Sequence, residues 1–443
     1  MLNQSFSVDN FRKIVDLENR KGIYLEGKFF HSLKTHTEDI KECNKLIKEC
    51  KRKPIALKDE LKELYNKRTE LENKREESLQ IELQKISEKI VTSNFKIELT
   101  KKNIPNKKPI YLVKDAPEHY FTIKQLQNNI SKLFGVKQSN RFEIISQITT
   151  LLNNNFPKYV LRTDISDFYE DIKHEPLLER INGNNLLTHL SKKFLKQILS
   201  NYLKLAGSDK GLPRGVGISA YLAELYMRDI DNDIMSLRGI SFYARYVDDI
   251  VIIFTPTLED QERNYLQDIK SIIENKFKLK LNTLKTVSFD LRYKSQQYTL
   301  EYLGYKILFG DGHIKTMLTD KKINKYKERL NLAFENYLNL SKVNEKNARK
   351  IFVKRIRHLT GNTRLRNNKN NVLVGIYYSN AHLTELQSLT SLDDFLRNKI
   401  TNEIKVTQLQ SRLREYSFES GFVEKRFSVF TTQELQKITK VWK

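Results

Sequence analysis

The sequence has 443 residues, and its 78 Lys and Arg outnumber 54 Asp and Glu, which gives a formal net charge of +24. With 30% charged and 39% hydrophobic residues the composition is globular, which excludes a disordered chain and an integral membrane protein. The length predicts two or three subdomains. The positive charge favours a polyanionic partner, although a merely soluble Lys-rich protein has the same composition.

The ends and the cysteines point to a cytoplasmic protein. No apolar run approaches the ~20 residues that span a bilayer, and the start MLNQSFSVDNFRK lacks the apolar centre of a signal peptide. Cys43 and Cys50 lie seven residues apart on an expected helix without a nearby His or further Cys, so we interpret them as ordinary thiols.

Residues 1–105 are rich in Lys and Glu and are expected to be helical. One apolar stripe at helical spacing predicts a long helix: Leu57, Leu61, Leu64, Leu71, Leu79, Leu83, Ile86 and Ile90. Pro54 separates it from an earlier helix near residues 37–50, which predicts an antiparallel helical hairpin. Such a hairpin is typical of structural elements, and of surfaces for a protein partner or for self-association.

The predicted secondary structure changes at two points along the rest of the chain. Residues 106–310 alternate short apolar strands with helices, and residues 311–443 return to basic helices, so the fold class is α+β. Arginines are dense in VKRIRHLTGNTRLRNNKNN, at Arg355, Arg357, Arg364 and Arg366. They predict contacts with nucleic-acid phosphates, with a solvated helix face as the equal alternative.

The stretch YARYVDDIVIIF sets two adjacent carboxylates, Asp248 and Asp249, inside an apolar run that predicts a buried strand. An unpaired ionised carboxylate is costly to bury, so the pair must lie where the strand ends or turns and meets a cation. A hairpin that binds a divalent metal satisfies this requirement. A plain polar hairpin tip is the alternative.

A third acid, Asp164, follows the apolar strand residues Val160 and Leu161 in KYVLRTDISDFYEDI. If Asp164 meets Asp248 and Asp249, three carboxylates offer the oxygen ligands that Mg²⁺ prefers. Two such ions, with Mn²⁺ as the substitute, activate an attacking hydroxyl and stabilise the leaving oxygen in phosphoryl transfer.

Three further segments lie around these acids. GLPRGVGIS contains Gly211, Gly215 and Gly217, and forms a loop whose backbone can approach a nucleotide closely, or simply a turn before a helix. FKLKLNTLKT places Lys285 after a short strand. EYLGYKI is a hairpin candidate.

In order and spacing these segments resemble the palm of reverse transcriptases. TDISDFY resembles motif A, GLPRGVGIS motif B, YVDD motif C, NTLKT motif D and YLGY the motif E primer grip. The resemblance covers residues 106–310. It implies a right-hand polymerase fold, with a helical region at residues 1–105, fingers and palm at 106–310, and a helical thumb with a C-terminal extension at 311–443.

The resemblance also implies roles for individual residues. Asp164, Asp248 and Asp249 would hold two metal ions, and Lys285 would protonate the pyrophosphate leaving group. Tyr169 would be the steric gate that excludes a 2′-hydroxyl. The primer grip would be Tyr302, Leu303, Gly304 and Tyr305, and the residues that contact the incoming nucleotide would include Arg141, Arg214 and Gly215.

One departure from the family pattern points to a particular subgroup of reverse transcriptases. Many members carry Gln where this chain has Arg214, and GVGIS replaces the more familiar GSPxS. Together with the helical flanks, this resembles the bacterial defence-associated, abortive-infection reverse transcriptases. The implied function is RNA-directed DNA synthesis with a bound noncoding RNA in antiviral defence. A retron-type enzyme, template-independent or protein-primed synthesis, and a non-polymerising RNA-binding scaffold are the alternatives.

Overall fold

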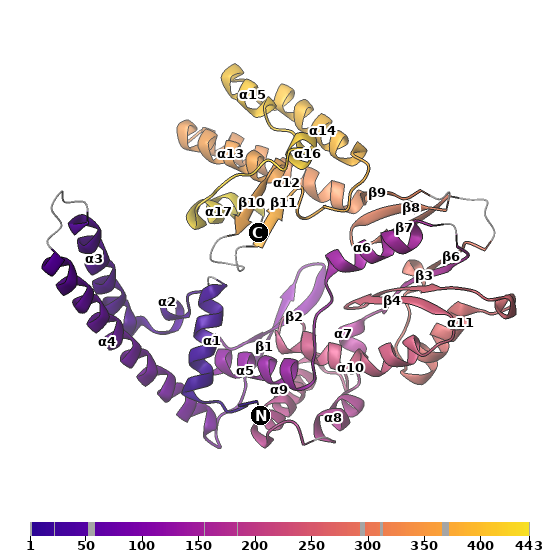
Figure 1. Ribbon diagram of the computed structural model, residues 1–443, viewed down its shortest axis with the longest axis horizontal. Helices are drawn as coiled ribbons and strands as arrows, with labels where there is room; N and C mark the ends of the chain where they lie inside the picture. Colours follow the sequence, from indigo (N-terminus) through magenta and orange to yellow (C-terminus); the bar gives the residue numbers. More distant parts are fainter. Residues whose placement is uncertain are drawn as a thin grey trace. The chain divides into compact units, whose positions relative to one another are not determined.

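The computed structural model describes residues 2–21, 23–51, 58–154, 156–183, 185–292, 297–310, 313–365 and 372–442. The chain divides into two compact units, and each unit is assembled from three separate segments. The first unit contains Met1–Gln138, Ile165–Ser236 and Asp268–Leu281, and the second contains Ser139–Asp164, Leu237–Gln267 and Asn282–Lys443. The helices and strands confirm the α+β class (Figure 1).

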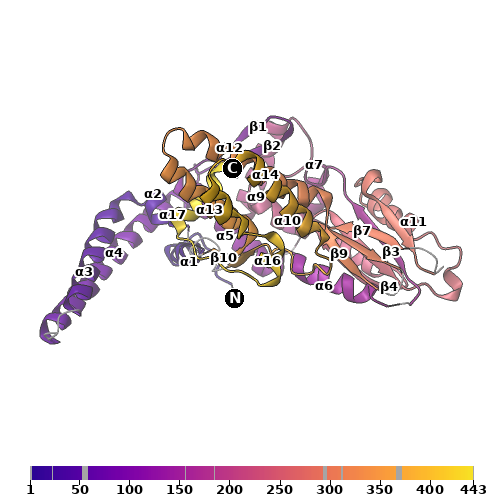
Figure 2. The same cartoon turned by 90° about the horizontal axis from the view of Figure 1, so that it is seen from above.

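The first unit contains the expected helical hairpin. Helices α3 (Lys34–Cys50) and α4 (Lys58–Val91) run side by side in both views (Figures 1 and 2). The predicted stripe is buried over the C-terminal half of α4, at Leu79, Leu83, Ile86 and Ile90. Pro54 and Leu57 lie outside the described residues. Cys43 and Cys50 are free and buried.

The rest of the first unit packs helices around a small hairpin. Strands β1 (Leu99–Ile104) and β2 (Lys107–Val113) pair antiparallel. The helices are α1 (Val8–Arg20), α2 (Leu25–Phe29), α5 (Pro117–Leu133), α7 (Phe168–Asp171), α8 (His174–Asn182), α9 (His189–Ala206) and α10 (Ile218–Met235). Buried Glu18 on α1 accepts a hydrogen bond from Tyr120 at 2.7 Å and pairs with Lys124 at 3.1 Å, which ties α1 to α5.

The second unit is built on a four-stranded antiparallel sheet in the order β4-β5-β3-β6. Its strands are β3 (Tyr159–Asp164), β4 (Ile240–Tyr246), β5 (Asp249–Phe254) and β6 (Val287–Asp290). Every residue from Ile250 to Phe254 is fully buried, as the apolar run predicts for a central strand. The register sets Asp164 directly opposite Asp249.

A second sheet and a group of helices complete this unit. Strands β7 (Tyr298–Tyr302), β8 (Tyr305–Phe309) and β9 (Lys315–Leu318) form a three-stranded sheet, and β10 (Asn362–Leu365) pairs with β11 (Val372–Gly375). The helices are α6 (Arg141–Leu152), α12 (Asp320–Ser341), α13 (Glu345–Thr360), α14 (Gln387–Glu403), α15 (Thr407–Arg414), α16 (Phe418–Val423) and α17 (Thr432–Thr439). Helix α11 (Tyr265–Lys270) contains residues of both units.

One hydrophobic core joins the elements of the second unit. It contains Val160 of β3 and Tyr302 of β7 together with Leu330 and Phe334 of α12 and Phe352 of α13. The C-terminal helices therefore share their core with both sheets. Among the described helices, none is long and apolar enough to cross a membrane.

Candidate active site

The acidic pair lies at the tip of the β4–β5 hairpin. Tyr246 pairs with Asp249, so Val247 and Asp248 form a two-residue turn. Val247 has φ +63°, a left-handed conformation that is strained for a β-branched residue. The guanidinium of Arg245 donates a hydrogen bond to the carbonyl of Val247 at 2.8 Å and so holds this turn.

Strand β3 lies beside β5 in the sheet, and Asp164 is its last residue. Two positions earlier on the same face lies Arg162, because side chains i and i+2 of a strand point the same way. The guanidinium of Arg162 reaches diagonally to Asp249 and donates two hydrogen bonds, at 2.9 Å from Nε and 3.1 Å from Nη2. Both side chains are largely buried. This two-bond geometry is the strong form of an arginine–carboxylate pair.

Lys285 lies on a short 3₁₀ turn, Thr283–Lys285, ahead of β6. Its Nζ donates to Oδ2 of Asp164 at 2.9 Å. The turn is fixed on β3 by a bond from Arg162 Nη1 to the Lys285 carbonyl at 3.1 Å, and by a hydroxyl contact of 2.7 Å between Thr163 and Thr286. The structure thus brings Lys285 together with Asp164, as the sequence predicts for one active site.

The carboxylates influence one another electrostatically. Burial raises the pKa of Asp249, the bonds from Arg162 lower it, and the charges of Asp164 and Asp248 raise it again. Tyr302 donates its hydroxyl to the backbone carbonyl of Asp249 at 3.0 Å, and burial raises the pKa of this phenol. The hydroxyl therefore stays protonated and supports the base of the turn.

The donor chemistry suits a divalent cation, because three mutually repelling carboxylates gather at the ends of β3, β4 and β5. In the described part of the chain, however, no three acidic, His or Cys side chains are arranged as a ligand group for a metal ion. Two of the three carboxylates are already paired with cations: Asp249 with Arg162, and Asp164 with Lys285. A metal must displace these cations.

The YLGY segment forms the expected hairpin. Leu303 and Gly304 both have positive φ, at +46° and +80°, and make a two-residue turn between β7 and β8. Arg141, at the start of α6, donates to the Leu303 carbonyl at 2.8 Å and lies 5.2 Å from the ring centre of Tyr305. The guanidinium therefore contacts this hairpin, and its contact with a triphosphate stays a prediction.

Lys322 of α12 also lies over the Tyr305 ring, with its Nζ 5.0 Å from the ring centre. Burial, with the charges of Arg141 and Lys325, lowers the pKa of Lys322 to about 7. In the described residues no carboxylate pairs with either Arg141 or Lys322. A cavity of about 470 Å³ opens between them, beside Gly304, and it suits an anion.

The motif A residues after Asp164 and the motif B loop lie in the first unit, and their charged side chains form a cluster there. Arg214 makes two bonds to the carboxylate of Glu170, one of them at 3.0 Å, and lies 5.3 Å from the ring centre of Tyr169. Lys108 of β2 also pairs with Glu170, at 3.0 Å, and with Asp167. Burial opposes the ionised form of Glu170, but the bonds from Arg214 and Lys108 outweigh it and lower its pKa.

Gly215 is required by its surroundings. Its φ is +93°, and a Cβ at this position would lie 2.9 Å from the carbonyl oxygen of Tyr111. The backbone N–H of Tyr111 donates to the carbonyl of Arg214 at 2.6 Å, so the loop lies directly against strand β2. The close approach here is to the protein's own backbone, and contact with a nucleotide stays a prediction.

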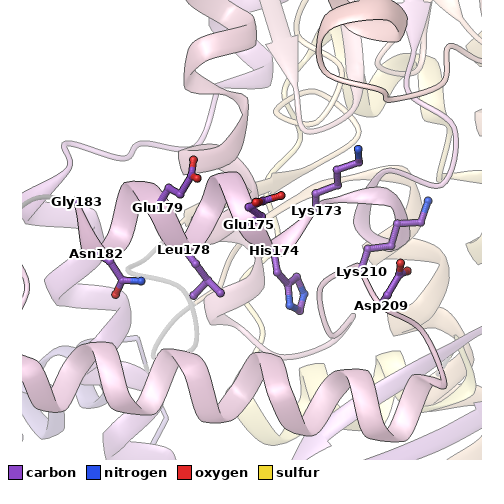
Figure 3. Close-up of a pocket in the computed structure, with 9 residues that line it drawn as sticks. All are labelled: Lys173, His174, Glu175, Leu178, Glu179, Asn182, Gly183, Asp209 and Lys210. Carbon is purple, nitrogen blue, oxygen red and sulfur yellow. The ribbon is translucent and has the colours of Figure 1, made fainter.

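A cavity of about 1000 Å³ lies elsewhere in the first unit (Figure 3). Its labelled residues come from α8 with its flanking Lys173 and Gly183, and from the segment at Asp209 and Lys210. They carry charges of both signs, and they include none of the predicted site residues. His174 contacts the carbonyl of Gly211 at 2.6 Å, which links α8 to the glycine loop. We assign no ligand to this cavity.

Sequence reasoning missed two cations of the second unit. Arg162 precedes Asp164 by two residues, and the period of a strand was the signal that placed both on one face. Lys322 lies on an amphipathic basic helix, where the sequence does not distinguish one lysine from its neighbours.

Comparison with known proteins finds a family match for the middle of the chain. Residues 119–307 match the family model described as reverse transcriptase (RNA-dependent DNA polymerase). This range includes the three aspartates, Tyr169, Lys285 and the Tyr302–Tyr305 hairpin. No curated protein sequence matches the chain significantly.

Three of the similar solved structures are telomerases from Candida species. Apo telomerase from Candida tropicalis is 14% identical with a TM-score of 0.40, covering 78% of this chain and 61% of that one. A form truncated from the C-terminal domain is 16% identical with a TM-score of 0.37, covering 51% and 56%. Candida albicans telomerase with a telomeric RNA fragment is 13% identical with a TM-score of 0.35, covering 78% and 61%.

This chain thus spans 56–61% of the length of these telomerase chains. The family match confirms the right-hand polymerase fold expected from the five motifs. Residues 119–307 are therefore similar to the reverse transcriptases, the RNA-dependent DNA polymerases, over the part of the chain that contains the five motifs.

Proposed function

We propose that this protein is an RNA-directed DNA polymerase that extends a primer with deoxynucleoside triphosphates. One observation carries the proposal: within a reverse transcriptase domain, the register of β3 and β5 sets Asp164 opposite Asp249, and the hairpin turn adds Asp248. A pair of acids at an ordinary hairpin tip does not require a third acid on the adjoining strand.

The residues divide the work as follows. Asp164, Asp248 and Asp249 would hold two Mg²⁺ ions, or Mn²⁺, which would supply activation of the primer hydroxyl and stabilisation of the leaving oxygen. Lys285 gives a proton to pyrophosphate, and the 2.9 Å contact of its Nζ with Asp164 supports this role. Tyr169 selects deoxynucleotides, and Arg214 and Gly215 shape the loop near the nucleotide.

The hairpin of Tyr302, Leu303, Gly304 and Tyr305 holds the primer end. The cavity with Arg141 and Lys322 supports this assignment, because two cations without carboxylate partners suit a phosphodiester. Here Arg141 neutralises primer phosphate instead of the incoming triphosphate.

We further propose that the enzyme acts with a noncoding RNA in antiviral defence. The support is the sequence resemblance to defence-associated reverse transcriptases, in the Arg214 departure and the helical flanks. The exposed side chains of the α3–α4 hairpin, Leu46, Tyr65 and Ile81 among them, offer a surface for a protein partner or a second copy.

The test is incorporation of labelled dTTP on a poly(rA)–oligo(dT) primer-template with Mg²⁺. Asp248→Asn removes one metal-binding charge and should lower incorporation by about 1,000-fold or more, because metal binding supplies several kcal/mol. The melting temperature should not fall, since the change relieves repulsion between carboxylates. Asp394→Asn, at an exposed acid of α14, is the matched control.

Retained incorporation in Asp248→Asn would refute the assignment. Sequencing the product made from all four dNTPs separates the alternatives: a complement of the supplied RNA supports templated synthesis, and a sequence unrelated to it supports template-independent addition. No product from the wild-type protein would support a scaffold.

A further inference from the structure

A groove of about 670 Å³ lies between helices α13 and α15 of the second unit. We propose that it binds the phosphate backbone of RNA, outside the primer-template contacts of the active site. This inference rests on the proposed function, and it names a second surface for the same class of partner. The groove is lined by Glu345, Lys346, Arg349, Lys350, Val353, Lys354, Arg357, Gln408, Leu409 and Arg412.

The groove has an apolar floor and cationic walls. Val353 of α13 and Leu409 of α15 are buried, at 5% and 4% exposure, and belong to the core that joins the helices to the sheets. A rigid floor holds the wall side chains in place. Six of the lining residues are cationic and one, Glu345, is acidic.

The cations differ in their partners. Arg349 pairs with Glu345, and Lys354 pairs with Glu434 of α17. Arg357 donates to the hydroxyl of Ser428 at 3.3 Å and lies against Phe430. The remaining three, Lys346, Lys350 and Arg412, are exposed. No carboxylate in the described ranges pairs with any of these three.

The spacing of the α13 cations suits a phosphate strand. Lys346, Lys350, Lys354 and Arg357 recur every three or four residues and so follow one helix face, with successive charges about 5.4 Å apart along the axis. Like charges at this spacing destabilise a helix by about 0.2–0.5 kcal/mol per pair. Phosphates along the groove would remove this repulsion.

The structure changes the set of basic residues that we expect to contact nucleic acid. Arg355, predicted from the arginine-dense stretch, is 4% exposed and donates to Asn336 at 2.5 Å and to the carbonyl of Ile438 at 3.3 Å. It is a structural residue of α13 and is closed to phosphate. Arg364 is exposed on β10, and Arg366 lies outside the described residues.

RNA fits this surface better than an acidic protein does. Protein interfaces depend on apolar and aromatic anchors that insert into pockets, and the apolar residues of this groove are already buried in the core. Lysine and arginine on a rigid helix are the usual partners of phosphate oxygens.

The experiment compares two triple variants of the full chain by RNA binding at several salt concentrations. The groove variant is Lys346→Gln, Lys350→Gln and Arg412→Gln. The control is Lys315→Gln, Lys437→Gln and Lys440→Gln, which removes the same charge from exposed positions off the groove. The probe is a labelled 20-base-pair RNA hairpin, and a melting curve for each variant establishes folding.

Each phosphate contact contributes roughly 0.7–0.9 to the slope of log affinity against log salt, so the groove variant should lose about 2 from this slope. At 0.1 M salt it should bind at least tenfold more weakly, while the control stays within about twofold of the wild type. An unchanged slope, or one that falls equally in both variants, would overturn the proposal. If the slope is unchanged, we would interpret the groove as a surface for an acidic protein partner.

Asp248→Asn keeps the two proposals apart. It should abolish incorporation and leave the salt slope of hairpin binding as in the wild type. If it retains incorporation, the proposed catalytic site fails while the groove result stands. If it is inactive but the groove variant binds as the control does, the groove proposal alone fails.

Discussion

Arg162 makes the two acids of the hairpin unequal. Asp249 carries a cation on its carboxylate and a tyrosine hydroxyl on its carbonyl, whereas Asp248 lies in the turn itself. Arg162 and Asp249 are both largely buried, so forming their ion pair carries a desolvation penalty. Only an ion pair with good hydrogen-bond geometry offsets this penalty. Arg162 therefore competes with any metal ion for Asp249.

The first prediction concerns this competition. Arg162→Gln should lower the Mg²⁺ concentration for half-maximal incorporation by a few-fold or more, since coupled neighbours typically interact by about 0.5–3 kcal/mol. It should also lower the melting temperature, because Asp249 loses its partner in a buried site. Arg292→Gln breaks the comparable pair with Asp290 and is the control. An equal Mg²⁺ requirement in all three proteins would contradict the competition.

The second prediction concerns Tyr169. Tyr169→Ala should raise the use of ribonucleotides relative to deoxynucleotides by about 10- to 200-fold, the range expected when one small group fits or clashes in a pocket. Tyr169→Phe keeps the ring and should keep the selectivity. Arg214 keeps its pair with Glu170 in both variants, so the salt bridge does not explain a difference between them. Equal selectivity in all forms would make Tyr169 a packing residue.

At the scale of elements, the β7–β8 hairpin is supported from two helices. Arg141 of α6 and Lys322 of α12 both lie against Tyr305. The charged groups that act on Lys322 are the cations Arg141 and Lys325, and its Nζ donates to the carbonyl of Ser379 at 3.4 Å. Burial lowers its pKa to about 7. Near neutral pH the hairpin cavity therefore changes its charge.

The third prediction follows from the sign of this shift. Above pH 7 Lys322 is mostly neutral in the free protein, and a phosphate favours its charged form, so binding must take up a proton. Affinity for a primer-template should fall as pH rises above about 7, approaching tenfold per pH unit. Lys322→Arg keeps its charge and should abolish this dependence. A pH profile shared by Lys322→Arg and the wild type would exclude Lys322 from phosphate binding.

The fourth prediction concerns the glycine loop and strand β2. Gly215→Ala should destabilise the protein by about 2 kcal/mol or more, because it imposes a side chain at φ +93° and drives Cβ against the Tyr111 carbonyl. Gly27→Ala is the matched control, since its Cβ would meet nothing within 4 Å on helix α2. Thermal unfolding compares them, and equal melting temperatures would show that the loop does not need glycine here.

At the scale of the whole molecule, the sequence predicted those features that depend on local sequence pattern. The five motifs, the strand of Ile250–Phe254, the YLGY hairpin and the helical hairpin all depend on residues close in sequence, where period and turn chemistry apply. The Arg162–Asp249 pair, the burial of Arg355 and the cation cavity at Tyr305 depend on register and on packing between distant segments. Hydrophobic pattern does not encode these, because a buried arginine and an exposed one occupy the same kind of helix position.

The fifth prediction concerns the junction at residue 310, where the sequence texture changes. Leu330, Phe334 and Phe352 pack into the core that also holds Val160 and Tyr302, and each fully buried side chain contributes about 1.5–3 kcal/mol. Because a whole protein is stable by only about 5–15 kcal/mol, a chain ending at 310 should not fold cooperatively and should expose apolar surface. A chain ending at 431 keeps Phe430 but loses Leu435 and Ile438 of the same small cluster, and should melt cooperatively at a lower temperature. Calorimetry and binding of an apolar dye decide between them: a cooperative transition in the shorter chain would mean that the palm sheet is stable without the helices, and that the thumb is a separate domain.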